Sequence, residues 1–209
     1  SWRAGRGKAI LADLGHNAGR PSTTIPTMKR LLALFAAALI ALPALAQNLV
    51  LVTKLELNTL DPHFFAAFPT GSSHPYLYDK LIVLDPKLKP RAALAESWKL
   101  VDDLTWEFRL RKGVAFHDGS PFTADDVLFT LERVPNVPNS PNSFSQYTRG
   151  IEKATKVDDH TIVLRTKAPN PMLPNDLSNV FIVSAKVAKG ATTGDFNSGK
   201  APSGTGPCK

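Results

Sequence analysis

Residues 95–134 read AESWKLVDDLTWEFRLRKGVAFHDGSPFTADDVLFTLERV, and this stretch predicts two strands, a tight turn and a helix in succession. Apolar and polar residues alternate over 105–111, which is the period-2 pattern of a strand with one face in water. Its partner strand is predicted over 98–101. Asp102 and Asp103 supply the turn between them, because short carboxylate side chains hydrogen-bond their own backbone.

A loop containing Gly113 and Gly119 leads to the predicted helix. The Thr123 hydroxyl is placed to accept from the first free N–H groups of that helix, and Asp126, three residues later, is favoured by the helix dipole. The apolar residues that follow recur at helical spacing and form one buried stripe: Val127, Leu128, Leu131 and Val134.

A second hairpin repeats the first. The residues VDDLT at 101–105 recur as VDDHT at 157–161, an offset of 56 residues. Two such units are too few for a solenoid array, so we predict two antiparallel hairpins in one small sheet, with the helix from Ala124 packed on its apolar face. That face is expected to consist of Trp106, Phe108, Leu110, Ile162 and Leu164.

The rest of the chain predicts further α/β elements. An apolar run at 49–52 has the length of a strand that is buried on both faces. Apolar runs and turn residues predict a short helix at 71–78, capped by Ser72 or Ser73, and a strand at 81–84. Composition predicts an exposed loop at 135–145. A short helix is predicted after Pro171, followed by an apolar run at 180–183 that returns towards the main sheet, a helix at 184–189, and a tail from 190 onward that ends without a closing element.

The net charge of +7 belongs mostly to the first 46 residues, which hold six of the 25 Lys and Arg and one of the 18 Asp and Glu. The remainder has 19 cations against 17 anions, or +2, and its cations are scattered. A nucleic-acid binder should gather Lys and Arg on one face, so nucleic acid is not expected as a partner.

The basic segment has the form of a secretory signal. Met28 is followed by the cations Lys29 and Arg30 and by an apolar run at 31–42. Ala44 and Ala46 then precede Gln47 in the small-x-small pattern of a cleavage site. A transmembrane helix needs about 20 apolar residues, so this run is too short for a stable membrane anchor. We predict a Sec-type signal peptide at 28–46, cleavage before Gln47, and a periplasmic protein.

No pattern of catalytic chemistry emerges. The five histidines show neither the i, i+4 spacing of helical metal ligands nor a neighbouring cysteine. Residues 117–119, HDG, are predicted to close the loop before the helix, and Cys208 is the only cysteine, so no internal disulfide is possible. The acidic pairs lie at turns or at a helix start, where local backbone bonding explains them. We predict no catalytic residue, no metal and no cofactor.

The order of ALAESW, acidic turn, aromatic strand, LRKGV, FHDG and TADDV resembles the signature of the extracellular solute-binding proteins of family 5, the dipeptide, oligopeptide and nickel group that serves ABC importers. The resemblance extends over residues 49–209. It implies an α/β fold of the periplasmic-binding-protein type II, with two lobes and a cleft that closes on ligand. It further implies a non-enzymatic monomer that captures a peptide or similar small solute and delivers it to an inner-membrane ABC permease.

The resemblance also suggests how the chain is divided: 1–27 as an upstream extension outside the fold, 28–46 as the signal peptide, 47–70 as the first strand and cleft loop of lobe one, 71–190 as a small α+β subdomain of lobe one, and 191–209 as the return towards lobe one. Only the first part of lobe one is then present, and we expect the chain alone to fold poorly and not to bind solute. Two alternatives remain open at this point. One is an exported enzyme whose catalytic half lies downstream, and the other is a free-standing interaction module over 71–190.

The loop after the first strand is the candidate solute contact, because ligands of open α/β sheets bind beyond the carboxyl ends of the strands. Its candidate ligand-binding residues are Asn58, Thr59, His63, Phe64 and Phe65. The alternative for the two phenylalanines is that they pack beneath the loop as core.

Overall fold

The computed structural model describes residues 59–66 and 73–208. The predicted strand at 49–52, the signal peptide and Asn58 lie outside these ranges. Within the described ranges, no helix has the length and apolar content that crossing a membrane requires.

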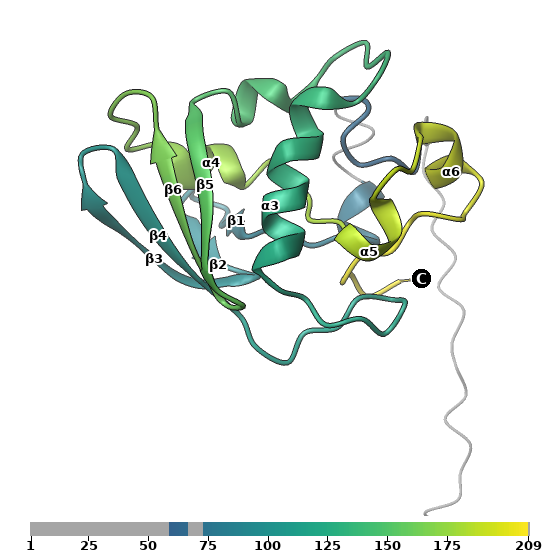
Figure 1. Ribbon diagram of the computed structural model, residues 1–209, viewed down its shortest axis with the longest axis horizontal. Coiled ribbons are helices and arrows are strands. Elements are labelled where there is room, and N and C mark those ends of the chain that lie inside the picture. Colours follow the sequence, from purple (N-terminus) through teal and green to yellow (C-terminus); the bar gives the residue numbers. More distant parts are fainter. Residues whose placement is uncertain (1–58, 67–72, 209) are drawn as a thin grey trace, which may run out of the picture. The chain divides into compact units, whose positions relative to one another are not determined.

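A four-stranded antiparallel sheet forms one side of this part of the chain (Figure 1). Its strand order is β3-β4-β6-β5, so the two hairpins meet along β4 and β6, as the repeated sequence predicts. The strands are β3 (Ala95–Asp102), β4 (Thr105–Leu110), β5 (Ile151–Asp158) and β6 (Thr161–Thr166). β3 is longer at both ends than the predicted strand over 98–101.

The inner face of the sheet forms the first hydrophobic core. Trp106 lies opposite Leu164 and Phe108 lies opposite Ile162, and all four are buried. Leu110, the fifth predicted residue of this face, is buried as well. The predicted apolar face is therefore confirmed.

Helix α3 (Ala124–Arg133) covers this face, because Val127 and Leu131 belong to the same buried cluster as the sheet residues. Its start is fixed by a capping box. The Asp126 carboxylate accepts from the backbone N–H of Thr123 at 2.8 Å, and the Thr123 hydroxyl lies 3.2 Å from the same oxygen. Gly119 takes a φ of +81°, which only glycine adopts at little cost, and turns the chain towards the helix as predicted.

Several short elements differ from the predictions. A separate hairpin joins β1 (Ile82–Leu84) to β2 (Pro90–Ala92), and β2 was not predicted. The predicted helix at 71–78 is a single 3-10 turn, η1 (His74–Tyr76), and the side chain of Ser73 makes no capping bond. The loop predicted at 135–145 begins and ends in 3-10 turns, η2 (Val134–Asn136) and η3 (Phe144–Tyr147). Phe144 is buried because it packs with Val134 and Val180, so this loop is not exposed throughout.

The last third of the chain contains three short helices: α4 (Leu173–Leu177), α5 (Ala185–Ala188) and α6 (Thr193–Asn197). The first two confirm the predicted helices. Helix α6 was not predicted, whereas residues 198–208 contain no helix or strand, as predicted for the end of the tail. A second capping box starts α6, in which the Asp195 carboxylate accepts from the Thr192 N–H and hydroxyl.

A second core joins the described loop 59–66 to the tail. Residues 180–183 are buried, but among the described residues their only bridge pairs Phe181 with Lys80. Phe181 and Val183 belong to the second core, whose residues come from segments far apart in sequence: Leu60, Leu77, Tyr78, Phe129, Phe181, Val183, Val187, Ala188, Ala191, Phe196 and Ala201. Residues on both sides of 71–190 are therefore needed to complete this core.

The end of the tail packs directly on the backbone of residues 76–78. Gly206 donates to the Leu77 carbonyl at 3.1 Å, and Cys208 donates to the Tyr76 carbonyl at 2.9 Å. His117 also binds the tail. Its backbone N–H donates to the Gly204 carbonyl, and its Nε2 lies 2.7 Å from the Gly206 carbonyl oxygen. A methyl group at position 204 would stand 1.9 Å from the Leu77 oxygen.

We therefore expect Gly204→Ala to lower the free energy of unfolding by at least about 1–3 kcal/mol, because backbone has to move to admit the methyl group. Gly194→Ala is the matched control, since its new methyl would lie 3.5 Å from the Thr192 Oγ1 in ordinary contact. Urea unfolding midpoints of the two variants measure the difference. Equal midpoints would show that the tail does not hold this position in solution.

Candidate functional site

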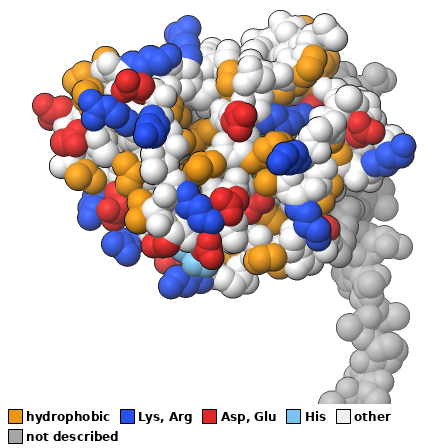
Figure 2. Space-filling model, in the orientation of Figure 1, with side chains coloured by type: hydrophobic (Ala, Val, Ile, Leu, Met, Phe, Trp, Pro, Cys, Tyr) orange, Lys and Arg blue, Asp and Glu red, His pale blue; other side chains and the backbone are white. Residues whose placement is uncertain are grey.

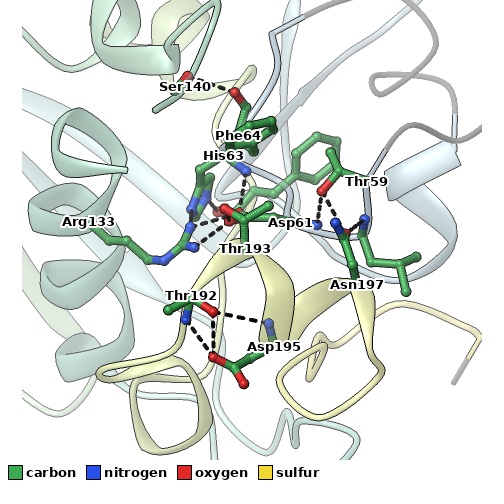
Figure 3. A network of polar contacts seen from close by, with 12 residues as sticks. Thr59, Asp61, His63, Phe64, Arg133, Ser140, Thr192, Thr193, Asp195 and Asn197 are labelled. Carbon is green, nitrogen blue, oxygen red and sulfur yellow. Dashed lines mark hydrogen bonds and ion pairs between the residues drawn. The ribbon is translucent and has the colours of Figure 1, made fainter. Parts of the chain in front are cut away.

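The loop of residues 59–66 contains the predicted solute contacts, and a buried ion pair holds its base (Figure 3). The Asp61 side chain is fully buried, and Arg133, the last residue of α3, binds it through the two terminal nitrogens of its guanidinium group. Nη2 lies 2.6 Å from Oδ2 and Nη1 lies 2.9 Å from Oδ1. The Arg133 side chain is itself only 10 % exposed and lies over the Phe196 ring at 4.6 Å. Two-point binding in a dry site makes this contact strong and directional.

His63 occupies the space between Arg133 and the second core. Its Nδ1 lies 2.7 Å from Nη1 of Arg133, and its Nε2 lies 2.7 Å from the Phe181 carbonyl oxygen. Because a guanidinium can only donate, Nδ1 has to accept, and the proton of the neutral ring sits on Nε2. The backbone N–H of His63 donates to Oδ1 of Asp61 at 3.0 Å.

Burial and charge set the ionisation of both groups. Burial lowers the pKa of His63, and the charge of Arg133 lowers it further, to about 4. Burial by itself would raise the pKa of Asp61, but the hydrogen bonds and charge of Arg133 outweigh burial and hold that pKa below its ordinary value. The site therefore consists of a carboxylate, a guanidinium and a neutral imidazole at neutral pH.

The tail closes the loop from the other side. Thr193 donates to Oδ2 of Asp61 at 2.8 Å, and Asn197 Oδ1 accepts from the Thr59 hydroxyl and from the Leu60 N–H, both at 2.8 Å. Helix α6 thus places two side chains against the loop, while α3 supplies Arg133. Three segments separated by up to 132 residues meet at one carboxylate.

The outer part of the loop is held through its backbone. Ser140 donates to the Phe64 carbonyl at 2.7 Å, and the Ala66 N–H donates to the Asn142 carbonyl at 2.9 Å. Phe64 and Phe65 are partly exposed. Phe64 lines a groove of about 360 Å³ together with Pro138, Asn139, Thr192, Thr193 and Gly194.

The predicted site residues thus separate into two groups. Thr59 and His63 are buried, 4 % and 0 % exposed, and their polar side-chain atoms bind other parts of the chain. Phe64 and Phe65 offer partly exposed aromatic surface beside a groove. Asn58 lies outside the described residues. Contact of any of these residues with solute stays a prediction.

The sequence analysis missed the residues that hold the loop: Asp61, Arg133, Thr193 and Asn197. Only Thr193 and Asn197 had a local signal, because Thr192 and Asp195 have the spacing of a capping box and start a helix there. Arg133 reads as an ordinary cation at the end of an amphipathic helix, and its partner is 72 residues away.

In residues 59–66 and 73–208, no three His, Cys, Asp or Glu side chains are grouped as a metal site. Asp118 binds Ser120, Ser203 and Lys186, and its pKa is lowered to about 2, first by the Ser120 hydroxyl. Residues 117–119 form the turn that closes the loop before α3, as predicted.

Comparison with known proteins gives the fold and then the family. The oligopeptide-binding protein AppA from Bacillus subtilis, solved in complex with a nonapeptide, superimposes with a TM-score of 0.64 and 28 % identity over 73 % of this chain and 31 % of its own. The chain thus has the α/β fold of the type II periplasmic-binding proteins. Residues 89–209 match the family model of the bacterial extracellular solute-binding proteins, family 5 Middle. The chain belongs to this family of solute-binding proteins.

Two curated relatives are similar to parts of the chain. The periplasmic oligopeptide-binding protein OppA of Escherichia coli (strain K12) is 31 % identical over 60 % of this chain and 26 % of its own length. The di/tripeptide-binding protein 2 of Pseudomonas aeruginosa (strain UCBPP-PA14) is 35 % identical over 90 % of this chain and 39 % of its own. The chain spans about a quarter to two-fifths of the length of these relatives.

Removing the arginine should strand the buried carboxylate. We expect Arg133→Met to lower the free energy of unfolding by about 3–5 kcal/mol, because Asp61 stays in a dry site without its counter-ion. Arg91→Met is the matched control, since Arg91 binds Asp85 with a side chain 64 % exposed, and it should cost less than about 1 kcal/mol. Chemical denaturation compares the two, and similar losses would show that the Asp61 ion pair is not a special anchor.

His63 should make stability fall on mild acidification. Its folded pKa of about 4 lies below its ordinary value of 6.5, so the unfolded chain binds more protons between these values. Stability is therefore complete above pH 6.5 and declines by about 3 kcal/mol as the pH falls through 4. Protonation of Asp61 removes more in stronger acid.

The measurement is the free energy of unfolding from urea titrations at closely spaced pH values, for the wild type and His63→Gln. The variant should lose the slope between pH 6.5 and 4. A slope of the same size in both proteins would assign it to other groups.

Proposed function

We propose that this protein captures peptides or closely similar small solutes in the periplasm and delivers them to an inner-membrane ABC permease. Family membership carries this proposal. The printed names of the two curated relatives are those of oligopeptide- and di/tripeptide-binding proteins, and the solved relative holds a nonapeptide. We propose that it acts as a binding protein without catalytic activity and as a monomer, after export through the signal peptide at 28–46.

We propose the loop at 58–65 as the part of this chain that contacts solute, in lobe one at 47–70. Phe64 and Phe65 are the proposed contact surfaces. Aromatic rings bind apolar side chains and the flat faces of peptide groups, and they lose little side-chain entropy on binding. Thr59 and His63 support them from beneath. A loop fixed by a bidentate ion pair is already in its binding conformation, which lowers the entropic cost of association.

The division of the remaining residues follows the same proposal. Residues 71–190 form a small subdomain of lobe one, and 191–209 return to lobe one. The hydrogen bonds between α6 and the loop support this return, since they place Asn197 against Thr59 and Thr193 against Asp61.

The proposal predicts a solute effect that depends on the two phenylalanines. The full-length protein, isolated from the cells that export it, should melt at higher temperature with saturating peptide, because ligand binds only the folded state. Phe64→Ala with Phe65→Ala should weaken binding in calorimetry by about fivefold to a hundredfold, at about 0.5–1.5 kcal/mol for each aromatic contact. Met172→Ala, which removes an apolar side chain 55 % exposed elsewhere, is the control and should bind as the wild type does.

Two outcomes would contradict the proposal. If no peptide from two to nine residues raises the melting temperature, the solute class is wrong. If peptides bind but the double variant binds them equally well, the class stands and the loop is not the contact.

A further inference from the structure

A groove lies between helix α3 and strand β5, away from the solute loop. Its volume is about 530 Å³. The apolar part of its lining is Leu128, Leu131, Pro135, Ile151 and Ala154. Figure 2 shows hydrophobic side chains at the surface between the sheet and α3. The groove is therefore a place where apolar side chains of another molecule can be buried.

The rim of the groove has an excess of unpaired cations. Arg149, Lys153 and Lys167 line it, and none of them has an ion pair or a side-chain hydrogen bond within residues 59–66 and 73–208. Of the two carboxylates in the lining, Glu152 is bound by Arg165 at 3.1 Å, which leaves Glu132 on the α3 side. The β5 side of the groove is thus positively charged and favours carboxylates.

β5 is also an edge of the sheet. It is paired with β6 alone, so one side of its backbone has no strand partner in the described part of the chain. Irregular register at 151–153 and 156–158 leaves the stretch between them regular. An unpaired edge accepts a further strand through main-chain hydrogen bonds.

The opposite edge of the sheet lacks this combination. β3 has an unpaired side too, and its Leu100 and Val101 are 48 % and 55 % exposed. None of the grooves described along this chain is lined by β3, however, and Lys99 is bound to Glu107 at 3.2 Å. Within residues 59–66 and 73–208, the apolar groove, the free cations and the open edge coincide at β5.

We propose that the α3–β5 groove docks an extended acidic segment of a partner protein. The segment adds a strand to β5, places alternate apolar side chains in the groove, and directs its carboxylates towards Arg149, Lys153 and Lys167. This interaction is separate from solute capture, because the groove shares no lining residue with the Phe64 groove. A partner of this chemistry can therefore recognise the protein with or without solute.

The test uses a fluorescent ten-residue peptide of alternating Glu and Val, with a Lys and Val peptide of the same length as its counterpart. Fluorescence anisotropy with the exported protein should give saturable binding of the acidic peptide in low salt, weakened at least tenfold by 0.5 M NaCl because screening acts on exposed charges. Arg149→Glu with Lys167→Glu should weaken binding at least tenfold. Lys87→Glu with Lys89→Glu, at two exposed cations in the β1–β2 turn, gives the same change in net charge and is the control that should bind as the wild type does.

Hydrogen exchange with and without the acidic peptide locates the contact. Amides of β5 should gain protection, while those of β3 should not. Arg149→Gln with Lys167→Gln provides a milder second variant, which should weaken binding in the same direction.

The proposal is overturned by any of four results: no saturation by the acidic peptide at millimolar concentration, equal binding of the Lys and Val peptide, displacement by a short peptide that raises the melting temperature through the solute site, or protection confined to β3. Concentration-dependent self-association that the double variant abolishes would instead assign the groove to a second copy of the chain.

Discussion

The buried ion pair between Asp61 and Arg133 is the constraint on which the position of the loop at 59–66 depends. A carboxylate with no exposed surface is tolerated only if its lost hydration is replaced, and here Arg133, Thr193 and the His63 N–H replace it. These groups come from the end of α3, the start of α6 and the loop itself. Because each of these groups replaces part of the lost hydration, losing any one of them leaves the buried charge less well compensated, and the three segments hold their positions together.

The sheet and the loop are stabilised by different physics. The sheet core is made of apolar residues from the two hairpins and helix α3, joined by residues of β1, of the loop before α3 and of α4, and the contacts within the sheet follow from alternation along each strand. Most of the polar side-chain contacts that fix the loop to α3 and α6 join residues 70 to 138 positions apart. Burial of area favours collapse without choosing one partner, whereas a bidentate ion pair fixes position and direction. The chain thus uses apolar packing for bulk stability and polar contacts where a surface has to be held in place.

The difference explains which features the sequence could predict. Both hairpins, the inner face of the sheet and the Asp126 cap depend on residues within a few positions of one another, and the pattern predicted them. Strand β2 was missed because Pro90 reads as a turn residue, although a proline is tolerated at the start of an edge strand. Helix α6 was missed because the composition of the tail outweighed its cap. Phe64 and Phe65 could be proposed as site residues from their place after a predicted strand, but no local feature of Arg133 points to an aspartate 72 residues away.

Helix α3 connects these parts, since it has a role on each of its sides. Val127 and Leu131 pack on the sheet, Phe129 enters the second core, and Arg133 fixes the loop. Leu128 and Leu131 also line the groove beside β5. A ten-residue helix capped at its start and packed on both sides has little freedom to shift, and a ligand can move an equilibrium only by favouring one of two accessible arrangements. Occupation of the α3–β5 groove should therefore leave solute affinity unchanged, so that this surface marks the protein for a partner without regulating what it carries.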